Sequence, residues 1–85
     1  MEFELENDLY ELLVNQVLDA SQYIFTISKV DKVRFSIKMK DIREVMLLIN
    51  DEIVFRGLDN QDTVNEFGIQ LYRLYDELFY QIETQ

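Results

Sequence analysis

Pairs of adjacent carboxylates are the residues in this chain whose types could support acid-base chemistry. Histidine and cysteine are both absent, which excludes the usual general base near neutral pH and every thiolate site. Asp51-Glu52 and Asp76-Glu77 could divide acid and base roles if their surroundings separated their pKa values. Sequence neighbours point in different directions on a turn or helix, so a polar turn and a solvated face explain both pairs. We expect no catalytic residue and no enzymatic activity.

An oxygen-rich segment raises the question of a metal site. Asp59-Asn60-Gln61-Asp62, with Glu66 beyond it, offers the oxygen ligands that Mg²⁺ and Ca²⁺ take. The segment lacks the alternating ligand positions and the central glycine of an EF-hand loop. Gly57 and Gly68 are too far apart to form a phosphate-binding glycine loop. We therefore expect a loop followed by a helix cap, with no metal and no cofactor.

Charge is sorted along the chain into two acidic ends and a mildly basic middle. The net charge is −6 over residues 1–22, +2 over residues 23–57 and −5 over residues 58–85, and −9 in total. A small, strongly acidic protein acts mainly by presenting its surface to a partner. The segments that carry these charges are therefore the main guide to function.

Six of the eight basic residues lie within fifteen positions of the middle segment. They are Lys29, Lys32, Arg34, Lys38, Lys40 and Arg43. A basic sheet face can bind nucleic acid, but a net charge of −9 repels a polyanion at long range. We expect these bases to pair with the acidic segments or with a second copy, and we expect no direct binding of nucleic acid.

The acidic ends suggest the opposite function, mimicry of nucleic acid. On a helix, Glu4, Asp8, Glu11 and Asp19 would form one stripe with carboxylates about 5–6 Å apart, similar to phosphates along one strand. Such a surface could block the basic groove of a nucleic-acid-binding enzyme. Small acidic phage and mobile-element inhibitors of the anti-restriction and anti-CRISPR kind are similar in general character, without a shared motif. The alternative is a face that only keeps the protein soluble. The candidate partner-binding acids are Glu4, Asp8, Glu11, Asp59, Asp62 and Glu66.

A second candidate surface lies on the expected C-terminal helix. Ile69, Tyr72, Arg73 and Tyr80 fall off the core stripe, and tyrosine beside arginine is enriched in interface hot spots. This side of the helix could instead pack inside the same molecule. If it is exposed, a homodimer or a structural adaptor module is the alternative to the inhibitor.

The chain has the length and composition of one small folded domain. It has 85 residues, 48% of them hydrophobic, and no proline. The acidic start lacks the basic region of a signal peptide, and no apolar run is long enough to cross a membrane. We expect a soluble cytoplasmic protein that does not contact membranes.

Hydrophobic periodicity predicts a helix, then strands. Apolar residues from Leu5 to Ala20 follow helical spacing, and the helix starts at a capping box at Asp8 or earlier, near Phe3. Residues 23–28 and 33–39 alternate with period two. We expect them to pair through a three-residue connection at 30–32, with Phe25 opposite Ile37 and Ile27 opposite Phe35.

Residues 41–58 allow two interpretations. β-Branched residues on both sides of Asn50-Asp51 favour a second hairpin that ends at Gly57. The alternative is a helix in which Ile42, Val45, Met46 and Ile49 line one face. We favour the hairpin.

The last segment is the longest periodic one. A capping box predicts a helix that starts at Thr63, or alternatively near Asn65, and runs to Ile82. Its core stripe is formed by Val64, Phe67, Leu71, Leu74, Tyr75, Leu78 and Ile82. The predicted architecture is α+β: an N-terminal helix, an antiparallel β-meander of three or four strands and a long C-terminal helix, both helices covering one sheet face.

Overall fold

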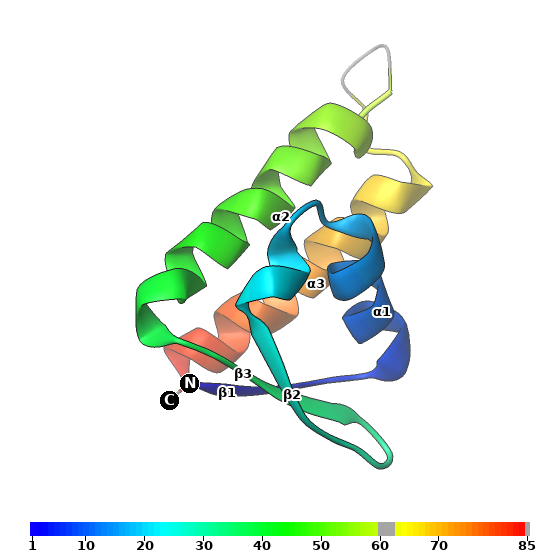
Figure 1. The fold of residues 1–85 in the computed structure, drawn as a ribbon. Helices are drawn as coiled ribbons and strands as arrows, with labels where there is room; N and C mark the ends of the chain where they lie inside the picture. The colour runs from blue at the N-terminus through cyan, green and yellow to red at the C-terminus, as the bar shows by residue number, and fades with distance from the viewer. Residues whose placement is uncertain (60–62, 85) are drawn as a thin grey trace.

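The computed structural model describes residues 1–59 and 63–84 and has the predicted α+β architecture. The main elements follow one another as β1 (Glu2–Leu5), α1 (Asn7–Gln16), β2 (Ile24–Lys29), β3 (Val33–Ile37), α2 (Ile42–Arg56) and α3 (Glu66–Glu83). Two 3-10 turns, η1 (Ala20–Tyr23) and η2 (Met39–Asp41), precede β2 and α2. The strands form one three-stranded sheet, and Figure 1 shows the helices stacked on one side of it. No helix in the described ranges combines the length and the apolar character needed to cross a bilayer.

The third strand of the sheet comes from the N-terminus. The strand order is β1-β3-β2, and both pairings are antiparallel, so the sheet is not a simple meander. Phe3 and Leu5 point into the core while Glu2 and Glu4 are exposed, which is the period-two pattern of a strand. The prediction of a helix over residues 5–20 was therefore too long. Glu6 has an extended backbone, and α1 begins at Asn7 without a side-chain cap, not with the capping box at Asp8.

The β2–β3 hairpin has the predicted length of connection but a different register. Residues 30–32 link Lys29 to its partner Val33. Phe25 lies opposite Ser36 and Thr26 opposite Phe35, so the predicted pairings of Phe25 with Ile37 and of Ile27 with Phe35 were both wrong. A bulge between Thr26 and Ser28 shifts the register, as the extra residue of a bulge does. Phe25 and Ile27 are consequently exposed.

Residues 42–56 form a helix, so the second hairpin predicted there was wrong. The alternative interpretation was correct for the inward residues: Val45, Ile49 and Ile53 are buried, and Ile42 and Met46 are half-buried. Gly57 ends this helix and not a strand, and its N–H donates to the carbonyls of Glu52 and Ile53. Burial of one complete helical stripe outweighs the modest β preference of the branched residues.

A close contact joins the end of α2 to the start of α3. Asn65 caps α3 by accepting the Gly68 N–H at 2.7 Å, so the helix starts at the alternative position and not at Thr63. The backbone N–H and side-chain Nδ2 of Asn65 donate to the carbonyls of Gly57 and Arg56, each at 2.9 Å. A Cβ on Gly68 would lie 2.2 Å from the Gly57 carbonyl oxygen, so glycine permits close packing on α2 and not on the sheet. Val64, expected in the helix stripe, precedes the helix and pairs with Leu58.

The core lies between the sheet and the helices. Its buried residues in the sheet are Phe3, Leu5, Val33, Phe35 and Ile37. The buried residues of α3 are Gly68, Leu71, Leu74 and Leu78, a close match to its predicted stripe. In Figure 1, α2 and α3 run antiparallel, α1 lies beside them, and the other face of the sheet stays uncovered. The helices therefore leave the sheet face and their own outer sides for interactions.

Candidate protein-binding surfaces

The acidic stripe predicted for one N-terminal helix is split between three structural contexts. Asp8 and Glu11 lie on α1, both exposed. Glu4 lies on β1, and Asp19 follows α1 in a left-handed conformation with φ 65°. The regular spacing of four carboxylates along one helix was therefore wrong. Asp8 and Glu11 remain as an i, i+3 pair on α1.

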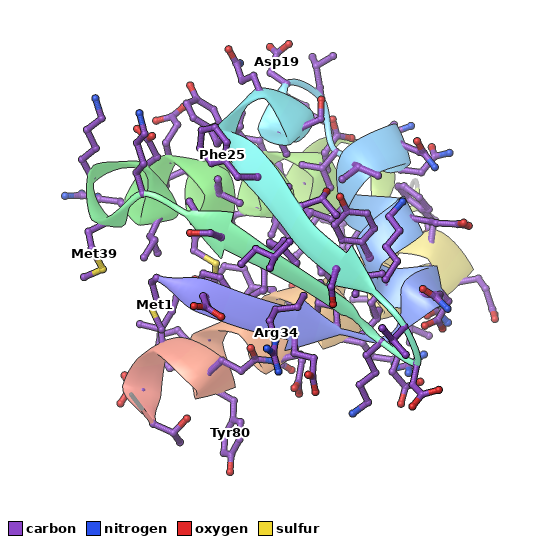
Figure 2. All side chains as sticks on the ribbon, turned by 60° about the horizontal axis from the view of Figure 1, so that its bottom comes forward. Met1, Asp19, Phe25, Arg34, Met39 and Tyr80 are labelled. Atoms are coloured by element: carbon purple, nitrogen blue, oxygen red, sulfur yellow. The ribbon has the colours of Figure 1, made fainter. Side chains whose placement is uncertain are left out.

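Glu4 takes part in the mixed-charge surface of the uncovered sheet face. Its carboxylate lies 3.8 Å from the guanidinium of Arg34 on the neighbouring strand, with both side chains about half exposed. Lys38 Nζ lies 5.6 Å from the ring centre of Phe25. Figure 2 views this face and labels Arg34 and Phe25 on it. Because acid, base and aromatic groups alternate here, the face is not a continuous anionic surface.

Two of the remaining candidate acids, Asp59 and Glu66, lie around the start of α3. Asp59 is exposed and accepts the Thr63 N–H at 3.0 Å, and Glu66 is exposed in the first turn of α3. Asp62 lies outside the described residues, and so does part of the segment considered as a metal loop. Elsewhere in the described chain, no three His, Cys, Asp or Glu side chains are grouped so that they could hold a metal ion.

The four residues proposed for an interface on α3 are all exposed. Ile69 and Tyr72 are about half exposed, Tyr80 is 61% exposed, and Arg73 donates to Gln70 at 2.8 Å. Arg73 and Tyr80 line a polar hollow between α3, β1 and the β2–β3 turn. The charged side chains around it are Glu4, Glu6, Lys32, Arg73, Asp76 and Glu77. Their opposite charges make this hollow a mixed surface.

A larger hollow, of about 690 Å³, is almost entirely apolar. It lies where the N-terminus, the start of α2 and the end of α3 meet. Its lining residues are Met1, Met39, Ile42, Arg43, Met46, Tyr75, Phe79 and Ile82. The rings of Tyr75 and Phe79 stack with centroids 6.3 Å apart, and Phe79 remains 48% exposed. Figure 2 shows Met1 and Met39 at the same end of the molecule.

All three methionines of the sequence line this apolar hollow. Methionine is flexible and polarizable, and surfaces that bind varied apolar partners are enriched in it. Met39 was expected to continue the inward face of a strand, but it lies in η2 and is 72% exposed. Phe79 was not selected from the sequence, although its position four residues after Tyr75 could have indicated a second apolar stripe on α3.

No family model, curated protein or solved structure matches this chain. The class of the protein therefore follows from its own fold and surfaces: an α+β domain with an apolar hollow and exposed acids on α1.

Proposed function

We propose that this protein is a non-catalytic binding protein and that it holds a protein partner in the apolar hollow where the start of α2 meets the end of α3. The observation that carries the proposal is the clustering of all three methionines with Tyr75, Phe79 and Ile82 around one open hollow. Soluble domains rarely expose grouped apolar side chains without a partner, since contact with water disfavours them. Aromatic residues and methionine are also enriched in protein interfaces.

A charge placed inside the hollow tests this function. Met46→Glu adds a carboxylate to the lining, whereas Val54→Glu adds one to an exposed apolar position on α2 outside it. Both variants should retain the helical circular dichroism spectrum of the wild type. Affinity capture from a native lysate should retain the same partner with wild type and Val54→Glu and lose it with Met46→Glu. If Met46→Glu retains that partner at wild-type level, the hollow is not the binding site.

A second candidate function is inhibition of a nucleic-acid-binding enzyme by the exposed acids of α1 and of the first turn of α3. Asp8, Glu11 and Glu66 are exposed, and none of them forms an ion pair with another described residue. Their negative potential is therefore not neutralised by the basic middle segment, and it is available to attract a basic groove. This function requires only a local group of exposed carboxylates, whereas the stripe expected from the sequence required four carboxylates at regular spacing along one helix.

Charge reversal on α1 separates the two functions. Asp8→Lys with Glu11→Lys should abolish capture of a basic nucleic-acid-binding protein and leave binding at the hollow unchanged. Raising the salt concentration should also release such a partner, because screening weakens attraction between exposed charges. Capture that survives both changes would rule out the acidic inhibitor.

A further inference from the structure

The charges around the apolar hollow define the chemistry of its partner. Arg43 is the one charged side chain in its lining, and no carboxylate lines it in the described part of the chain. Lys40 follows Met39 in the sequence and is exposed, whereas Lys38 lies beside Phe25 on the uncovered sheet face. Two acids lie in the same segment, Asp41 and Glu44, but neither lines the hollow. In a chain with 17 acidic and 8 basic residues, this end presents cations beside apolar side chains.

Two helix ends of opposite polarity lie at this hollow, the start of α2 and the end of α3. Asp41 is the N-cap residue, and its side chain makes no capping hydrogen bond. The first N–H groups of a helix carry partial positive charge, which favours a nearby anion. The last carbonyl groups of α3 carry partial negative charge and oppose this effect, so the preference for an anion rests on Arg43 and Lys40.

The hollow also restricts the conformation of its partner. Neither open edge of the sheet contributes to its lining, which comes from the first residue, η2, α2 and α3. A bound segment therefore finds apolar side chains here and no strand edge with which to pair. A helix satisfies its own backbone hydrogen bonds and presents apolar side chains from one face, as in helix-in-groove recognition.

We infer that the apolar hollow takes an acidic amphipathic helix of a partner protein. Apolar side chains of that helix enter among Met39, Met46 and Phe79, and carboxylates at its edge face Arg43 and Lys40. This inference rests on the proposed function and names the partner's chemistry. A second copy is disfavoured because two molecules of net charge −9 repel each other. The repulsion matters less for a short acidic segment, since charges more than about 10 Å away are largely screened at 0.1 M salt.

The three methionines make the test direct. With methyl-¹³C-methionine, the protein gives signals from Met1, Met39 and Met46 only, and all three line the hollow. The probes are two helical peptides of about 18 residues that have the same leucine face. The positions on either side of that face are all glutamate in one peptide and all lysine in the other. The glutamate peptide should shift all three signals and bind about fivefold more tightly, the sum of two exposed charge pairs. At about 0.5 M salt, where the screening length is roughly 4 Å, the difference should disappear.

Matched variants and the oligomeric state complete the test. Lys40→Glu with Arg43→Glu should reverse the preference for the two peptides, while Lys32→Glu, a base that does not line this hollow, should leave it unchanged. Equal or tighter binding of the lysine peptide would overturn the inference and leave the proposed function intact. Absence of methionine shifts with either peptide would refute the hollow as a protein-binding site. A concentration-dependent dimer that Met46→Glu dissociates would assign the hollow to a second copy and would also overturn the inference.

Discussion

Replacing Gly68 by alanine should destabilise the protein, although the same change in an ordinary helix stabilises it. Alanine is favoured over glycine inside a helix by about 1 kcal/mol. The added Cβ would lie 2.2 Å from the Gly57 carbonyl oxygen and 2.9 Å from Gly57 Cα, well inside the 3.4 Å at which ordinary contact begins. Both atoms belong to the backbone, so a rotamer change cannot relieve the clash.

The cost can be worked out from the contacts that must move. Overpacking of this kind costs about 1–3 kcal/mol. Shifting α3 away from α2 also strains the two hydrogen bonds from Asn65 to Arg56 and Gly57, each contributing about 1 kcal/mol. After the gain in helix propensity is subtracted, Gly68→Ala should lower the free energy of unfolding by about 2 kcal/mol. For a domain of this size, that corresponds to a fall in Tm of roughly 8–16 °C.

Urea denaturation followed by far-ultraviolet circular dichroism measures this loss. Asn50→Ala is the matched control, because Asn50 is exposed on α2 and the change also raises helix propensity. The control should be neutral or slightly stabilising. If Gly68→Ala is as stable as the wild type or more stable, the close approach of α2 and α3 at this pair of glycines is wrong.

Two further changes test how the sheet is held. Gln81→Met should lower the free energy of unfolding by about 1–2 kcal/mol. The Gln81 amide accepts the Glu4 N–H at 3.0 Å and donates to the Glu4 carbonyl at 2.7 Å, and these two hydrogen bonds cover the open edge of β1. Faster amide hydrogen exchange at Glu4 in the variant would confirm this cause, and unchanged exchange would contradict it. Tyr10→Phe keeps the ring against Phe35, at 5.4 Å between centroids, but removes the hydrogen bond between the Tyr10 hydroxyl and Thr26. The free energy of unfolding should therefore fall by about 1 kcal/mol. In a protein that already carries Thr26→Val, Tyr10→Phe should lower the free energy of unfolding measurably less.

Local pattern was sufficient to predict the elements that bury one regular face. Val33, Phe35 and Ile37 alternate with polar residues, and the central strand forms at that place. Leu71, Leu74 and Leu78 of α3 follow helical spacing, and the helix occupies most of the predicted range. In both segments the burial pattern fits only one secondary structure, so contacts from the rest of the chain reinforce the local preference.

Local pattern failed where the same residues fit two structures. Leu5 continues the helical stripe of α1 and also alternates with Glu4 and Glu6, so its local sequence fits a helix and a strand. Leu5 forms a strand because it pairs with Val33, which is distant in sequence. Once β1 occupies that side of β3, and β2 the other, no place beside the central strand remains for a second hairpin. Residues 42–56 then bury their apolar face as a helix against α3. Long-range pairing, which a single sequence does not display, settled both segments.

The formation of a helix over residues 42–56, in place of the expected hairpin, creates the apolar hollow. In a hairpin, Met46 would alternate with its neighbours across a sheet, and Ile42 would lie in the preceding turn. In a helix, Ile42 and Met46 are one turn apart and both lie on the side that meets Tyr75 and Phe79 of α3. Arg43 lies beside them at the edge of the same surface.

The cationic residues expected on a sheet face are thereby divided between two surfaces. Arg34 pairs with Glu4 on the sheet, whereas Arg43 lies beside apolar side chains without an ion pair among the described residues. The inferred binding surface thus takes its charged edge from part of a basic cluster that we expected to pair with the acidic segments or with a second copy, and the preference inferred for an acidic partner depends on the helix and not on the composition.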